Sequence, residues 1–149
     1  MKNVIYYVLI AGVVALLGFL GWKIIGSNDQ PADDGTAANP IQNVNWQWVS
    51  LVDEGTPFDV PNPADYTITF NSDGTLTGKA DCNTFEGTYS QANGLVITIS
   101  SSTMAFCGEA SLDTMYLSLL GSVVAGGPDG AGGLALETAG GAERMMFSK

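Results

Sequence analysis

Histidine is absent from the 149 residues, and the chain holds only two cysteines. The missing imidazole excludes Ser-His-Asp triads, Cys-His dyads and zinc sites with a histidine ligand. Basic residues are scarce as well, with 5 Lys+Arg against 15 Asp+Glu and a net charge of −10. Because contact with nucleic-acid phosphates needs a basic face, this composition predicts a protein that binds no nucleic acid. It also predicts a non-enzymatic protein without a metal or other cofactor.

The first 26 residues are strongly apolar. Residues 4–25 contain a single charge, Lys23. At about 1.5 Å per residue, a helix of this length spans roughly 33 Å, which is enough for a hydrocarbon core of about 30 Å. The alternative is a cleaved signal peptide, but its apolar stretch is about 7–15 residues and ends at a small-x-small cleavage site. We therefore predict a transmembrane signal-anchor over residues 1–26, which places the membrane among the partners.

The remaining chain divides into two parts. Residues 27–43 read SNDQPADDGTAANPIQN and lack an apolar period, which predicts a disordered linker. Residues 44–149 are long enough for one domain. Lys2 and Lys23 nearly balance across the apolar run, so the orientation follows only weakly from the positive-inside rule. The long acidic domain favours export, and we expect a single-pass membrane protein with this domain extracytoplasmic, in the periplasm or at the cell surface.

Alternation of inward and outward side chains marks the strands of this domain. It recurs in residues 46–51, 66–70 and 95–99, with β-branched and aromatic residues at many positions. Residues 134–136 and 145–147 indicate a terminal hairpin. The turn signals between these runs include Asn-Ser-Asp-Gly at 71–74, which we interpret as a β-turn rather than a calcium loop. The glycine-rich stretch at 126–133 is interpreted as a hairpin loop.

One segment has the helical period instead. Apolar residues after Ser111 are spaced i, i+3, i+4, i+7 and i+8, which is an amphipathic stripe. Ser111 is the expected N-cap, and Gly121 the expected end. The pattern predicts a mainly β fold: a small antiparallel barrel or curled sheet with one packed α-helix.

Several short motifs carry a family signature. They are Trp48, PADYTITF at 63–70, ADCN at 80–83, GTY at 87–89, TMAFC at 103–107 and the helical segment at 111–120. Together they resemble the META domain, also called the HslJ-like family, over about residues 44–149. Many members read Gly-Cys-Asn and Met-Ala-Cys, so Asp81 and the inserted Phe106 suggest a subgroup.

The resemblance implies a lipocalin-like antiparallel β-barrel with a helix. It also implies attachment to the bacterial envelope, as a lipoprotein or an anchored protein. Some members are linked to the heat-shock response and to novobiocin resistance. The family brings no agreed catalytic residues, and none is carried over to this chain.

Cys82 and Cys107 have three interpretations. In an exported domain, an even pair is typical of a disulfide, worth about 3–4 kcal/mol for a loop of this length. The alternatives are two reduced, buried thiols and a redox site. The redox site is disfavoured because the chain has no C-x-x-C motif and no basic neighbour that would lower a thiol pKa.

The family motifs also supply candidate binding residues: Trp48, Tyr66, Asp81, Asn83, Gly87, Tyr89 and Thr103. Asp81, Asn83 and Glu86 form the tightest polar group, which could contact a ligand at a barrel mouth. The alternative is hydrogen bonding within turns, the commoner role of Asp and Asn. For Trp46 and Trp48, a place in the core is likewise the commoner fate.

Three functions remain. The first is a non-catalytic binding or interaction module that recognises an envelope protein or an apolar ligand. The second, from family resemblance alone, is a stress or drug-tolerance factor that assists another membrane protein. The third is a carboxylate-dependent hydrolase, which needs no histidine, although no carboxylate pair is marked by its spacing.

Overall fold

The computed structural model describes residues 39–149. The predicted anchor and most of the predicted linker lie outside the described residues. Among the helices of residues 39–149, none combines the length and the apolar character needed to span a bilayer.

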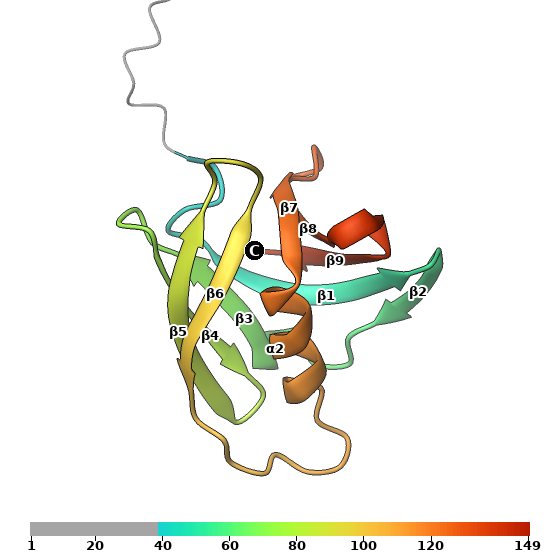
Figure 1. Ribbon diagram of the computed structural model, residues 1–149. Coiled ribbons are helices and arrows are strands. Elements are labelled where there is room, and N and C mark those ends of the chain that lie inside the picture. The colour runs from blue at the N-terminus through green and yellow to red at the C-terminus, as the bar shows by residue number, and fades with distance from the viewer. Residues whose placement is uncertain (1–38) are drawn as a thin grey trace, which may run out of the picture. The chain divides into compact units, whose positions relative to one another are not determined.

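An antiparallel sheet forms most of the domain (Figure 1). Its strands follow the chain as β1 (Asn45–Asp53), β2 (Thr56–Asp59), β3 (Tyr66–Phe70), β4 (Thr75–Ala80), β5 (Asn83–Ser90), β6 (Val96–Ser102), β7 (Val123–Pro128), β8 (Leu134–Thr138) and β9 (Glu143–Ser148). The α-helix α2 (Asp113–Gly121) lies between β6 and β7 in sequence, and short 3-10 turns occupy Pro63–Asp65 and Ala139–Gly141. The hydrogen-bonded order is β6-β5-β4-β3-β1-β9-β8-β7, and β2 pairs with β1 beside this path. The predicted mainly β architecture is therefore confirmed.

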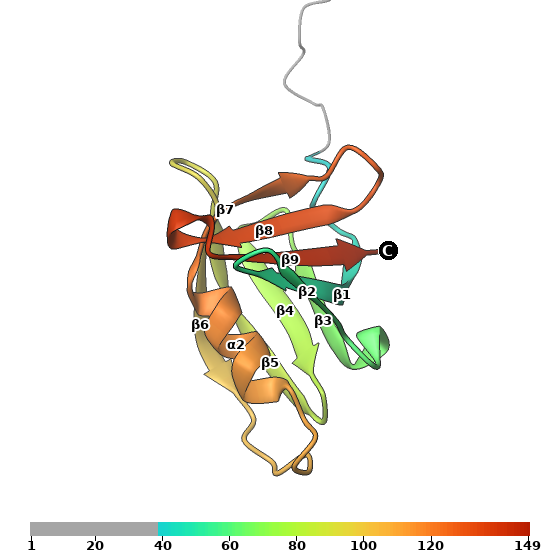
Figure 2. The same ribbon diagram turned by 90° about the vertical axis from the view of Figure 1, so that its right-hand side faces the viewer.

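The sheet curls without closing into a complete barrel. Its end strands are β6 and β7, and no ladder joins them in residues 39–149. They approach at one end, where a Cβ on Gly94 would lie 2.3 Å from the Val124 carbonyl oxygen. Helix α2 packs against the open side and buries Tyr116, Leu119 and Leu120 in the core (Figure 2). Of the two predicted forms, the curled sheet with one packed helix is confirmed: the structure is a half-barrel, not a closed lipocalin-like barrel, and the helix packs against its open side.

Tyr116 of α2 lies at the centre of the core. Its ring stacks on Trp48, with centroids 5.2 Å apart, and meets Tyr66, Phe85 and Phe147 at 5.7, 6.0 and 6.4 Å. Trp48 and Trp46 are both buried. Their predicted place in the core is therefore confirmed, and the contact of Trp48 with Tyr116 joins the helix to the sheet.

The packed domain begins before residue 44. Ile41 is buried, with 1% of its surface exposed, and its carbonyl accepts a hydrogen bond from Trp46 Nε1 at 2.9 Å. The Asn43 N–H donates to the Phe70 carbonyl at 2.8 Å. Residues 39–43, expected to end the disordered linker, instead pack against the sheet because Ile41 completes its core.

Of two local predictions, the β-turn at 71–74 is confirmed and the N-cap of the helix is wrong. At 71–74 the predicted β-turn is present, with Gly74 N–H donating to the Asn71 carbonyl at 3.2 Å. The helix N-cap is wrong by one residue: Leu112, not Ser111, occupies it. Ser111 Oγ still accepts from the Asp113 N–H at 3.2 Å. The shift follows from the Leu112 N–H, which donates to the Tyr66 hydroxyl and fixes where the helix begins.

Candidate functional site

Two large apolar side chains are exposed to solvent on the loop between β6 and α2. Met104 is 93% exposed and Phe106 is 84% exposed, both on residues 103–112, which connect β6 to α2 and are called the presenting segment below. In both ribbon views this segment lies at the end of the domain opposite residue 39 (Figure 1, Figure 2). Exposure of this extent costs hydrophobic free energy. Three attachments nevertheless hold the segment in this position.

The buried side chain of Asn83, at the start of β5, fastens the middle of the presenting segment. Its Oδ1 accepts from the Ala105 N–H at 2.7 Å and from Thr103 Oγ1 at 3.0 Å. Its Nδ2 donates to the Ala105 carbonyl and to Asp113 Oδ2, both at 3.0 Å. Thr103 Oγ1 also accepts from the Thr84 N–H at 3.0 Å. One amide therefore ties the segment to the sheet and to the helix.

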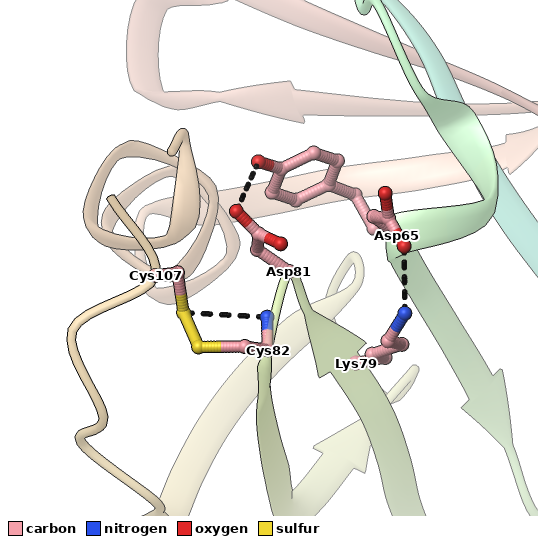
Figure 3. A network of polar contacts seen from close by, with 6 residues as sticks. Asp65, Lys79, Asp81, Cys82 and Cys107 are labelled. Carbon is pink, nitrogen blue, oxygen red and sulfur yellow. Dashed lines mark hydrogen bonds and ion pairs between the residues drawn. A yellow bond between two sulfur atoms is a disulfide. The ribbon is translucent and has the colours of Figure 1, made fainter. Parts of the chain in front are cut away.

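A disulfide makes the second attachment. Cys82 and Cys107 are bonded, with their Cα atoms 5.5 Å apart, which joins the β4–β5 turn to the presenting segment. The Cys82 N–H also points to Cys107 Sγ at 3.3 Å (Figure 3). The predicted pairing is present, and it lies directly beside Phe106.

Tyr66 makes the third attachment, at the end of the segment. Its hydroxyl accepts from the Leu112 N–H at 2.9 Å and lies 3.4 Å from Asp81 Oδ2 (Figure 3). Asp81 sits in the turn with φ of +58°, a left-handed conformation that Asp tolerates better than most residues. Glycine, which the family resemblance would place here, adopts the same conformation without strain. The departure at Asp81 is therefore compatible with the turn and adds a carboxylate next to Tyr66.

A groove lies between the presenting segment and α2. It encloses about 680 Å³ and is lined by the apolar Met104, Phe106 and Leu117 and the acidic Glu109 and Asp113, among others. None of the three basic side chains in residues 39–149 lines it. They lie elsewhere: Lys79 pairs with Asp65 at 2.7 Å, Arg144 lies 3.4 Å from Glu137, and Lys149 is over the Trp46 ring. The groove is thus apolar with an acidic lining.

The other candidate residues serve the framework away from this groove. Trp48 Nε1 donates to the Ser50 carbonyl at 2.9 Å, within the core. Tyr89 donates its hydroxyl to the Asn71 carbonyl at 2.7 Å and accepts from Gln42 Nε2. Gly87 lies so close to β6 that a Cβ would be 2.1 Å from the Thr98 carbonyl oxygen. These three positions therefore have structural explanations.

The predicted polar group of Asp81, Asn83 and Glu86 is not assembled as one cluster. Asn83 is buried and bonded, Asp81 lies in the preceding turn, and Glu86 is exposed and accepts from Ser101 Oγ at 3.0 Å. Hydrogen bonding within the fold, the alternative to ligand contact, describes Asn83. Sequence analysis did not predict the exposure of Met104 and Phe106. The available signal was the presence of two apolar residues in a stretch that fits neither the strand period nor the helix period.

A second concavity of about 600 Å³ lies on the outer face of the sheet. It is lined mainly by hydroxyl side chains, including Thr67, Thr69 and Thr77. Phe85 is the one aromatic residue in its lining, and its hydroxyl groups come from several strands. It therefore offers fewer distinctive contacts than the groove beside the presenting segment.

In the part of the chain that the structure describes, three titratable side chains have shifted pKa values. The Thr75 hydroxyl, which donates to Asp73, lowers the pKa of that carboxyl, and the Ala131 and Gly133 N–H groups lower the pKa of Asp129. Burial raises the pKa of Tyr116 well above its ordinary value. None of the three lines the groove. In residues 39–149, no three His, Cys, Asp or Glu side chains are grouped so that they could hold a metal ion.

Comparison with solved structures shows the same fold elsewhere. A DUF4847 family protein from Bacteroides vulgatus is similar with a TM-score of 0.59 and 16% identity, covering 72% of this chain and 93% of that one. A protein from Burkholderia xenovorans is similar with a TM-score of 0.58 and 22% identity, covering 74% and 87%. At these identities the likeness shows the fold alone.

Comparison at the level of sequence is decisive for the family. No curated protein matches the chain. The family model of the META domain, in contrast, matches residues 39–149. The matched range begins close to Ile41, the first buried residue of the domain. The chain therefore belongs to the META domain family.

Proposed function

We propose that the protein is a non-catalytic binding module of the cell envelope, anchored in the membrane through residues 4–25, with its META domain extracytoplasmic. The observation that carries the proposal is the exposure of Met104 and Phe106 on a segment fastened by Asn83, by the disulfide and by Tyr66. A segment whose backbone is already fixed loses little backbone conformational entropy on binding. Free side chains on a flexible loop would lack this advantage.

The proposed location is supported by chemistry of the domain. Structural disulfides persist in oxidising compartments outside the cytosol, and the Cys82–Cys107 bond is part of this fold. The apolar run at 4–25 is long enough for an anchor. Together these two features favour an envelope protein over a cytosolic one.

The non-catalytic character is supported by the groups at the groove. The carboxylate of Asp113 accepts hydrogen bonds from the Asn83 amide and from the Thr114 N–H at the start of α2. It therefore holds the fold together. Cys107, which also lines the groove, is in a disulfide. The second groove carboxylate, Glu109, is exposed on the presenting segment, whereas the acid of a catalytic carboxylate pair works from a shielded site.

Site-specific photocrosslinking in cells tests the proposal. A benzoyl-phenylalanine replaces Phe106 in one variant and Phe58 in the control, since Phe58 on β2 is also exposed but lies outside the groove. We expect a discrete adduct from position 106 and none of the same mass from position 58. Identical adducts from both positions, or none from 106, would contradict a contact at the presenting segment. An adduct with another membrane protein would favour the assisting-factor alternative.

A further inference from the structure

We infer that the groove beside the presenting segment docks a short segment of a partner protein in which an apolar side chain is flanked by lysine or arginine. The inference rests on the proposed binding function and specifies the chemistry of the partner. Its basis is the combination of apolar and acidic side chains in one concavity.

The apolar half of the groove fits a small anchor. Met104 is unbranched and adapts to the shape of a bound side chain, and Phe106 offers a flat, rigid ring. Leu117 of α2 faces the same concavity, whose volume is about 680 Å³. A space of this size takes a drug-sized molecule or a short peptide rather than a folded surface. The expected occupant is therefore a leucine, methionine or aromatic residue together with the residues beside it.

The acidic side chains of the groove determine which residues of the partner can lie next to its apolar anchor. Glu109 is exposed on the presenting segment, and Asp113 lines the same groove. No cation from residues 39–149 neutralises them there, because Lys79, Arg144 and Lys149 contact other groups. A basic side chain next to the apolar anchor would meet both carboxylates, whereas an acidic one would be repelled. Charge complementarity therefore distinguishes a basic partner from a neutral one.

A lipid surface fits less well. Exposed Met and Phe side chains can enter a bilayer, but the groove carboxylates would be repelled by anionic headgroups. We therefore commit to a protein segment and treat lipid as an outcome of the test.

The test is a selection of random twelve-residue peptides displayed on phage against the full chain in phosphatidylcholine nanodiscs. We expect the selected peptides to combine an apolar residue with an excess of Lys and Arg. Phe106→Ser should weaken their binding about tenfold, and Phe58→Ser should leave it unchanged. Glu109→Gln should weaken it about threefold at low salt, with Glu54→Gln as the matched control.

The outcomes separate this inference from the proposed function. Peptides that need Phe106 but carry no basic excess, or bind E109Q as tightly, would overturn the basic partner and leave the contact surface standing. Peptides that ignore Phe106→Ser, or no selected peptide at all, would overturn both. Binding of the nanodisc-held chain to phosphatidylglycerol vesicles without peptide, if it is lost in Phe106→Ser, would assign the groove to lipid and overturn the inference.

Discussion

Asn83 and Asp113 are joined by a hydrogen bond of 3.0 Å from amide nitrogen to carboxylate oxygen, which ties the start of β5 to the first residue of α2. The same amide holds both backbone groups of Ala105. A single buried side chain thus connects a strand, the presenting segment and the helix. This contact gives Asn83 a structural role at the junction of β5, the presenting segment and α2.

Replacement of Asn83 tests this role. Asn83→Ala should lower the free energy of unfolding by about 2–4 kcal/mol, because the Ala105 N–H and Asp113 Oδ2 lose the amide that they bond. Chemical denaturation measures the change, and Asn93→Ala, in an exposed turn, is the matched control. An Asn83→Ala protein as stable as the control variant would show that water replaces the amide.

Loss of the disulfide should destabilise the domain by about 3–4 kcal/mol, since the unfolded chain regains the freedom of the closed loop. Cys82→Ser with Cys107→Ser and reduction of the natural chain should shift the denaturation midpoint by the same amount. Alkylation of the denatured, unreduced protein should find no free thiol. Two modified cysteines in that assay would refute the bond.

Gly87 should tolerate no side chain. A Cβ at this position would lie 2.1 Å from the Thr98 carbonyl oxygen, so Gly87→Ala forces β5 and β6 apart. We expect a loss of about 1–3 kcal/mol in the free energy of unfolding. Gly127→Ala on β7 is the control, because its Cβ would meet nothing within 4 Å. Equal stabilities of the two variants would argue against this close contact between strands.

Tyr116→Phe should raise stability. The Tyr116 hydroxyl is buried and has no hydrogen-bond partner among residues 39–149, while its ring packs on Trp48. Removal of the unpaired hydroxyl keeps the ring contacts, and we expect a gain of about 1 kcal/mol or more. Thermal unfolding measures it. A lower melting temperature for the variant would indicate that a partner outside the described residues satisfies the hydroxyl.

The same residue predicts an alkaline effect. Burial raises the pKa of Tyr116 in the folded protein well above the ordinary value of 10.0. Above that pH the unfolded chain releases the proton and the folded chain keeps it, so stability falls as pH rises toward the folded pKa. The advantage of Tyr116→Phe should therefore grow between pH 9 and 11 in denaturation measurements. An advantage that is constant with pH would mean that the hydroxyl ionises as easily when folded.

Local pattern by itself determined most of the elements. Strand alternation at 66–70, the apolar stripe after Ser111 and the terminal hairpin are all readable, because backbone geometry repeats every two or 3.6 residues. The disulfide could also be predicted, because two cysteines allow only one intramolecular pairing. The strands and the helix depend on residues that are neighbours in sequence, and the disulfide has no alternative pairing within the chain.

Only the tertiary structure decided where the groove lies and what frames it. Asn83 meets Ala105 and Asp113 across 22 and 30 residues of sequence, and Ile41 enters the core from a stretch that reads as linker. Whether Met104 and Phe106 are buried or exposed depends on these distant attachments, as does the helix that fills the open side of the sheet. Burial is a property of contacts between remote segments, and a one-dimensional period carries no information about which segments meet.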